Sequence, residues 1–137
     1  MKSMMAILFL IAISTTLNSQ KDEPNSDDTQ LVSFSDMGYP GLAKVARIQG
    51  IVVVEARLDD NGNVVGASAI SGNKLLVADC LSNVKRWKFK AKSHNSAVIV
   101  YEFKLDDGAC HDDSHSLFRL RYGNFASVTA CARVLGG

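Results

Sequence analysis

The side chains best suited to bind a metal ion lie in one short segment near the C-terminus. Cys110, His111, Asp112, Asp113 and His115 fall within residues 110–115. Thiolates, imidazoles and carboxylates are the usual protein ligands of zinc and copper, so this segment allows a small metal-binding secreted enzyme. We favour a polar loop beside a disulfide, because a bridged Cys110 cannot bind a metal. On that interpretation the protein has no metal site and no cofactor.

The three cysteines divide into a pair and a single residue. Cys110 and Cys131 flank a β-rich segment, and in an oxidising compartment they are the natural pair. A bridge between them would close a loop of about 20 residues and stabilise the fold by roughly 3 kcal/mol. Cys80 falls on an apolar helical stripe, where we expect a buried and unreactive thiol.

A run of cations with interleaved aromatic residues occupies the middle of the chain. It consists of Lys85, Arg86, Trp87, Lys88, Phe89, Lys90 and Lys92. Such a run is typical of a nucleic-acid surface, but it also fits a helix end and a strand start with solvated charges around a buried tryptophan. With 15 Lys and Arg against 14 Asp and Glu, the net charge is only +1, which is little for binding a phosphate backbone. We therefore predict the second arrangement and no nucleic-acid partner.

Motifs of the common enzyme classes are missing from the sequence. It contains no nucleophile elbow, no phosphate-binding loop and no acid–base pair. The carboxylates of Asp59 and Asp60 fall in a turn, where we expect them to be solvated. A composition of 47% hydrophobic and 21% charged residues is that of an ordinary globular domain. We predict that the protein is not an enzyme.

The first 38 residues form two segments of contrasting composition. Lys2 precedes an apolar run over residues 4–13, about half of the roughly 20 residues that a membrane-spanning helix needs. Small residues follow as far as Ser19, so we predict a signal peptide over 1–19 and a periplasmic or secreted location. The alternative is an uncleaved inner-membrane anchor with the rest of the chain facing the periplasm. Residues 20–38 are polar and acidic and predict a disordered leader.

The body of the chain begins with a short helix and a β-hairpin. Leu42, Val45, Ala46 and Ile48 give this helix one apolar side, which we expect to be buried. Apolar residues then alternate with polar ones over 51–58, and again more weakly over 64–71, as in strands covered on one face. Asn61-Gly62 lies between these strands and marks a tight turn, because both residues tolerate a positive φ.

A second helix and the longest strand follow. Asn73 is placed to cap a helix over 74–87, and apolar residues alternate in the strand over 89–105. Two further β-rich segments, 117–122 and 125–134, predict an additional hairpin. The whole pattern predicts an α+β fold, with a small antiparallel three-stranded sheet, two helices on one face and a C-terminal β-hairpin extension.

The stretch 39–105 resembles the C-terminal domain of TonB-type energy transducers. The markers of that family are a Tyr-Pro pair before a short helix, a glycine, a valine-rich strand, an Asp-x-x-Gly turn, a strand ending in Ser-Gly, a helix, and Trp-x-Phe before a third strand. In this chain the markers with structural roles are Tyr39, Pro40, Gly50, Gly62, Gly72, Trp87 and Phe89. We assign the TonB C-terminal-like domain to 39–107 and a β-rich, disulfide-linked extension to 108–137.

The resemblance implies a non-catalytic periplasmic domain that binds proteins. In TonB-like transducers this domain grips a segment of an outer-membrane receptor as an added β-strand during energy-dependent transport. Main-chain hydrogen bonds at an exposed sheet edge supply the affinity in such β-augmentation. The third strand is the expected edge, with partner-binding residues Ser96, Val98, Val100, Tyr101, Glu102 and Lys104. The expected partner is a TonB-dependent outer-membrane receptor or an envelope protein, and a homodimer stays open.

The chain differs from the family pattern at both ends. The N-terminal apolar run is short, and the spacer after it, about 25 residues, is not proline-rich and so lacks stiffness and reach. The tail beyond the third strand is additional. If its β-rich segment pairs with the third strand, the tail would either inhibit binding or protect the edge from aggregation. For an inhibitory tail we expect truncation after Asp107 to raise binding to receptor peptides.

Overall fold

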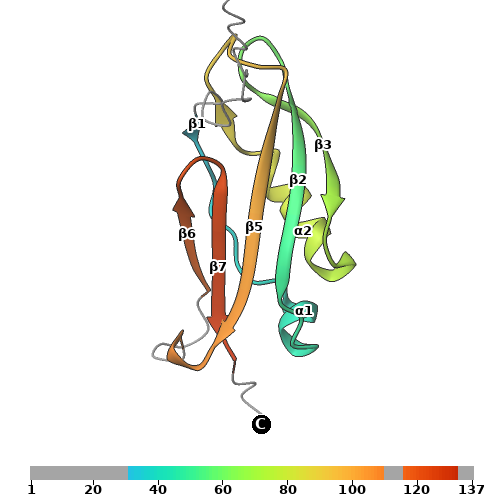
Figure 1. The fold of residues 1–137 in the computed structure, drawn as a ribbon, viewed down its shortest axis with the longest axis vertical. Helices are drawn as coiled ribbons and strands as arrows, with labels where there is room; N and C mark the ends of the chain where they lie inside the picture. Colours follow the sequence, from blue (N-terminus) through green and yellow to red (C-terminus); the bar gives the residue numbers. More distant parts are fainter. Residues whose placement is uncertain (1–30, 110–115, 133–137) are drawn as a thin grey trace, which may run out of the picture.

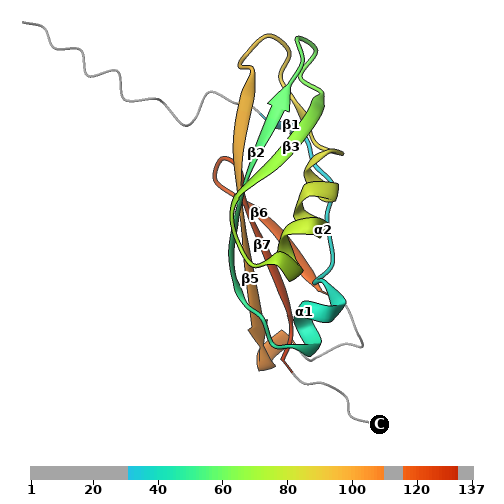
Figure 2. The ribbon, with the colours of Figure 1, turned by 90° about the vertical axis from the view of Figure 1, so that its right-hand side faces the viewer.

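A sheet with two helices packed on one face forms the centre of this α+β fold (Figures 1 and 2). The computed structural model describes residues 31–109 and 116–132. In chain order its elements are β1 (Leu31–Ser33), α1 (Gly41–Val45), β2 (Gly50–Leu58), β3 (Val64–Ser71), α2 (Lys74–Val84), β4 (Lys88–Phe89), β5 (Ser96–Asp106), a 3-10 turn (Asp107–Ala109), β6 (Leu117–Arg121) and β7 (Phe125–Cys131).

The main sheet has five strands in the order β3-β2-β5-β7-β6, and β1 pairs separately with β4. The β2, β3 and β5 strands are antiparallel, but β7 lies parallel to β5 and β6 is antiparallel to β7. The predicted three-stranded antiparallel sheet is therefore wrong in strand number and direction. The predicted C-terminal hairpin does form, and it joins the sheet because Ala126, Val128 and Ala130 extend the apolar face of β5.

The turn between β2 and β3 forms at Asn61-Gly62, as the sequence predicts. The Asp59 carboxylate accepts hydrogen bonds from the backbone N–H groups of Asn61 and Asn63, at 3.0 and 2.8 Å. These bonds, led by that of Asn63, lower the pKa of Asp59. Gly62 has a φ of 81°, and a Cβ atom there would lie 1.9 Å from the Phe89 carbonyl oxygen. Only glycine fits this position without displacing the backbone.

The two helices meet the sheet differently. Asn73 caps α2 as predicted, since its side chain accepts a hydrogen bond from Leu75 N at 2.9 Å. The α1 helix buries only Ala43, whereas Leu42 and Val45 are 74% and 69% exposed, so the predicted buried side is wrong at these two residues. Ile48, just after the helix, does pack against the core. The space beside this short helix is filled instead by Tyr39, whose ring packs against Phe103 at a centroid distance of 5.4 Å.

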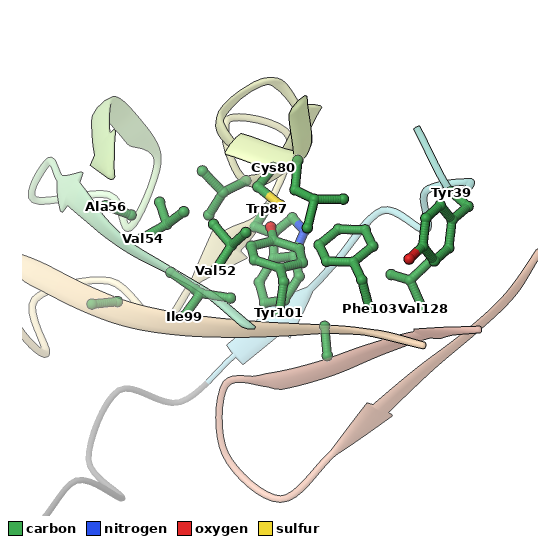
Figure 3. Close-up of a cluster of buried hydrophobic side chains, with 14 of the residues drawn as sticks. Tyr39, Val52, Val54, Ala56, Cys80, Trp87, Ile99, Tyr101, Phe103 and Val128 are labelled. Carbon is green, nitrogen blue, oxygen red and sulfur yellow. The ribbon is translucent and has the colours of Figure 1, made fainter. Parts of the chain in front are cut away.

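The core lies between α2 and the sheet, as Figure 3 shows. Its largest fully buried side chains are Tyr101, Phe89, Phe103, Leu76, Ile99, Val52, Val54, Val84, Val128, Asn83 and Cys80. Asn83 is the polar member of that group. Its amide donates to the carbonyls of Ser35 and Asp36, and its Oδ1 accepts from Trp87 Nε1 and Tyr101 Oη. The side chain is therefore fully hydrogen-bonded, as burial requires.

Residues 31–38 make long-range contacts with the rest of the fold, in contrast to the prediction that they belong to a disordered leader over 20–38. Its β1 strand pairs with β4, where Leu31 lies opposite Phe89. The Phe34 ring stacks on Phe118 at 5.8 Å and meets Trp87 at 6.1 Å. These long-range contacts hold the segment against the core, where Leu31 and Met37 also pack.

Several predictions from the sequence fall outside the described ranges. The signal peptide over 1–19, the first part of the leader and Cys110 belong to this group, so the disulfide with Cys131 stays a prediction. Within 31–109 and 116–132, neither helix has the length and apolarity needed to cross a membrane.

Candidate partner-binding edges of the sheet

The predicted partner-binding strand, β5, lies inside the sheet. It pairs with β2 from Ser96 to Phe103 and with β7 from Val100 to Asp106. Its outer side is thus covered from Val100 onward, and the prediction of an exposed edge holds only for the short segment 96–99. The tail does pair with the third strand, which is the condition set above for an inhibitory or protective role.

The predicted binding residues of β5 divide between the two faces of the sheet. The face opposite the helices carries Ser96, Val98, Val100, Glu102 and Lys104. There the Lys104 ammonium forms an ion pair with the Glu102 carboxylate at 2.9 Å. Tyr101 points into the core, where it is fully buried and bonded to Asn83. Because its side chain is fully buried, Tyr101 supports the fold and is not available to a partner, and the same burial raises the pKa of its phenol.

The family markers Tyr39, Trp87 and Phe89 are all buried in the core. Trp87 packs against Tyr101 with ring centroids 6.0 Å apart, while the Tyr39 hydroxyl donates to the carbonyl of Ile48. The predicted buried tryptophan with solvated cations around it is confirmed. The cations at 85, 86 and 90 are exposed, and Lys88 bonds Asn63 Oδ1 at 2.6 Å.

The remaining glycine and proline markers shape the backbone around this core. Pro40 accepts a hydrogen bond from Lys44 N, which starts α1. Gly50 begins β2, and Gly72 lies close to Val52, which a Cβ at Gly72 would contact at 2.8 Å. These residues shape the backbone at the start of α1 and at the ends of β2 and β3.

One outer strand of the described sheet, β3, is a poor template for another strand. Its pairing with β2 is interrupted by two irregularities, one after Val53 and one after Arg57. The guanidinium of Arg57 lies across Gly66, where an added Cβ would be 2.2 Å from Nη2. Bulges and charged side chains over an edge are the devices by which sheets avoid edge-to-edge pairing.

The opposite outer strand, β6, is regular. All five of its residues pair with β7 without a bulge, from Leu117 opposite Thr129 to Arg121 opposite Phe125. Leu117, Arg119 and Arg121 are exposed, and the two residues between them are half-buried. From the sequence, this hairpin was considered only as a cover for the third strand, β5. Its outer strand, β6, was not identified as a new edge of the sheet.

The described surface also has hollows on the helix side of the sheet. One of them, about 1020 Å³, lies between the segment 34–39, α2 and the start of β6. A smaller one, about 420 Å³, lies between the end of β3 and α2. The first is lined by both polar and aromatic side chains, among them Asp79, Arg86 and Phe118.

The residues considered for metal binding, 110–115, lie outside the described ranges. Within those ranges no group of three or more His, Cys, Asp or Glu side chains could hold a metal ion. Cys80 is buried on α2, and burial raises the pKa of its thiol to about 12. This position agrees with the prediction that Cys80 is a buried and unreactive thiol.

Comparison with known proteins gives one family. The model of the family described as the C-terminal domain of the Gram-negative bacterial TonB protein matches residues 35–105. That range runs from the ordered segment before α1 to the end of β5 and leaves β6 and β7 outside. No curated protein and no solved structure matches the chain. Domains of this family are periplasmic and non-enzymatic, and they interact with proteins such as outer-membrane receptors.

Proposed function

Because the chain belongs to the TonB C-terminal domain family, we propose that it is a periplasmic module that binds a segment of an outer-membrane receptor by β-strand addition. The family connects it to energy transduction across the envelope. Its role would be to hold a receptor segment during transport, and the chemistry would be main-chain hydrogen bonding without catalysis.

The observation that supports this proposal most directly is the mixed five-stranded sheet with an outer strand that is regular and unpaired within the described residues. An outer strand presents a row of N–H and C=O groups to an extended peptide. Residues 31–38 and the helices already cover the apolar face of the sheet. A strand added at the outer edge would therefore leave the core intact.

A direct test uses the purified protein and peptides of about ten residues from the N-terminal periplasmic segments of the host's TonB-dependent receptors. We expect at least one peptide to bind and to protect amide groups of an outer strand from hydrogen exchange. The proposal is wrong if none of these peptides binds. It is also wrong if a bound peptide slows amide exchange only at residues away from the outer strands.

A further inference from the structure

We infer that the tail moves the binding edge of the sheet outward, from β5 to β6, and that β6 selects an extended segment carrying acidic residues. This inference rests on the proposed strand addition and names its site and the chemistry of its partner. The β6 edge lies outside residues 35–105, the range that matches the family.

The β7 strand is built into the core, so it is unlike a removable cover. It pairs with β5 over seven consecutive positions. The side chains of Ala126, Val128 and Ala130 are buried on the face of the sheet that carries the helices. Its neighbour β6 adds the Phe118 ring, which stacks on Phe34. Displacing the hairpin would expose all of these side chains to water, at a cost that a short peptide would have to offset. A partner reaches β6 without that cost.

The backbone N–H and C=O groups of alternate residues in β6 point to the outer edge of the sheet. Val100 N donates to Asn124 O at 2.9 Å. The backbone N–H and C=O groups of the even-numbered residues of β7 therefore point toward β5, and those of the odd-numbered residues point toward β6. Ser127, an odd-numbered residue, lies directly opposite Arg119. The N–H and C=O groups of Phe118 and Leu120 therefore point to the outer edge, where an added strand would bond them.

Charge on this edge favours an acidic partner. Arg119 and Arg121 project on the face opposite the helices, and neither forms an ion pair within the described residues. Residues directly opposite on neighbouring strands interact, and opposite charges there are favourable. Carboxylates spaced two residues apart on an added strand would meet both arginines, and an apolar residue two positions further on would meet Leu117.

The same charges disfavour a second copy of this chain as the occupant. In an antiparallel β6–β6 pair centred on Arg119, the two Arg119 side chains would lie directly opposite one another. Shifting the centre to Leu120 would set Arg119 against Arg121. Like charges in such positions destabilise strand pairing, so a heterologous acidic segment fits the edge better.

The test uses the full protein and two synthetic seven-residue probes, one alternating glutamate with valine and the other alternating lysine with valine. We expect the glutamate probe to bind at least about tenfold more tightly than the lysine probe at low salt, with the difference shrinking as salt is added. Amide exchange should slow at Phe118 and Leu120. The double variant R119E/R121E should reverse the preference, whereas K74E/K85E, which changes the net charge equally at the two ends of α2, should keep it.

Three results would overturn the inference while leaving strand addition intact. In the first, receptor peptides bind and protect β3 or residues 96–99 while β6 exchange is unchanged. In the second, both probes bind equally well. In the third, Phe118 and Leu120 are already protected before any probe is added, either in a dimer or within one chain. Failure of every receptor peptide and both probes to bind would instead contradict the proposed function itself.

Discussion

Asn83 Oδ1 accepts a hydrogen bond from Trp87 Nε1 at 2.9 Å, one turn further along the chain and inside the core. The same oxygen accepts from Tyr101 Oη, and the amide nitrogen donates to the backbone of residues 35 and 36. One buried side chain thus connects α2, β5 and the segment before α1. The position of that segment therefore depends on the helix.

Replacing Asn83 by alanine should therefore destabilise the protein strongly. The change leaves two carbonyls, an indole N–H and a phenol without their partner, and each unsatisfied buried group costs about 1–3 kcal/mol. We expect a loss of at least about 3 kcal/mol in urea unfolding. Asn61→Ala, in an exposed position, is the control and should change stability by less than about 1 kcal/mol. A loss below 1 kcal/mol in N83A would show that water replaces this network.

The Gly62 turn supplies a second test of the fold. Gly62→Ala combines a positive φ with a Cβ placed 1.9 Å from the Phe89 carbonyl, so backbone must shift. We expect a loss of more than about 2 kcal/mol, measured by denaturant unfolding. Gly41→Ala is the matched control, because open space surrounds that position at the start of α1. Equal stabilities of the two variants would contradict the close approach of the turn to β4.

Local elements could be predicted because their signals lie within a few residues. The strand 64–71, the Asn73 cap and the Asn61-Gly62 turn each depend on neighbours in the chain, and the structure has them where the sequence indicates. The alternation of 89–105 also placed Tyr101 on the apolar side. Its inclusion among partner-binding residues ignored that signal.

The global arrangement depends on contacts that no short window contains. Alternation in 125–134 predicts a strand with one apolar side, but it does not say that this strand lies parallel to β5. Residues 31–38 are held by the stacking of Phe34 on Phe118, the pairing of β1 with β4 and the hydrogen bonds from Asn83, and all of these partners are distant in sequence. Asn83 carried a signal that could have been used, since a lone amide on the apolar side of a helix requires buried partners.

Stability should fall at alkaline pH because of the buried ionisable groups. Burial raises the pKa of Cys80 from about 9 to about 12, and burial also raises the pKa of Tyr101. Above pH 9 the unfolded chain releases protons that the folded chain keeps, so each rise in pH favours unfolding until the folded thiol ionises near pH 12. Urea midpoints between pH 8 and 11 should decrease steadily, and Cys80→Ala should show a shallower decrease. Identical slopes for the two proteins would contradict the buried thiol.

Truncation after Asp107 separates the two roles that the tail could play. Removing β6 and β7 takes Val128 and Ala126 out of the core and leaves Phe34 without Phe118, so we expect a loss of at least about 3 kcal/mol. The truncated chain should also bind the glutamate probe at least about tenfold more weakly, because the arginine-bearing edge is gone. An inhibitory tail predicts the opposite result, namely tighter binding of receptor peptides by a truncated chain that is still folded.

A crosslink between β5 and β7 tests the same choice without removing any residue. Val100 and Phe125 are register partners on the face opposite the helices. Neighbouring strands lie about 4.8 Å apart, which is within the range that a disulfide spans. The double variant V100C/F125C, oxidised and verified by peptide mass, would hold the hairpin in place. If β6 is the binding edge, the oxidised protein should bind receptor peptides as tightly as the reduced one. If the hairpin must leave β5 to admit a partner, oxidation should abolish binding and reduction should restore it.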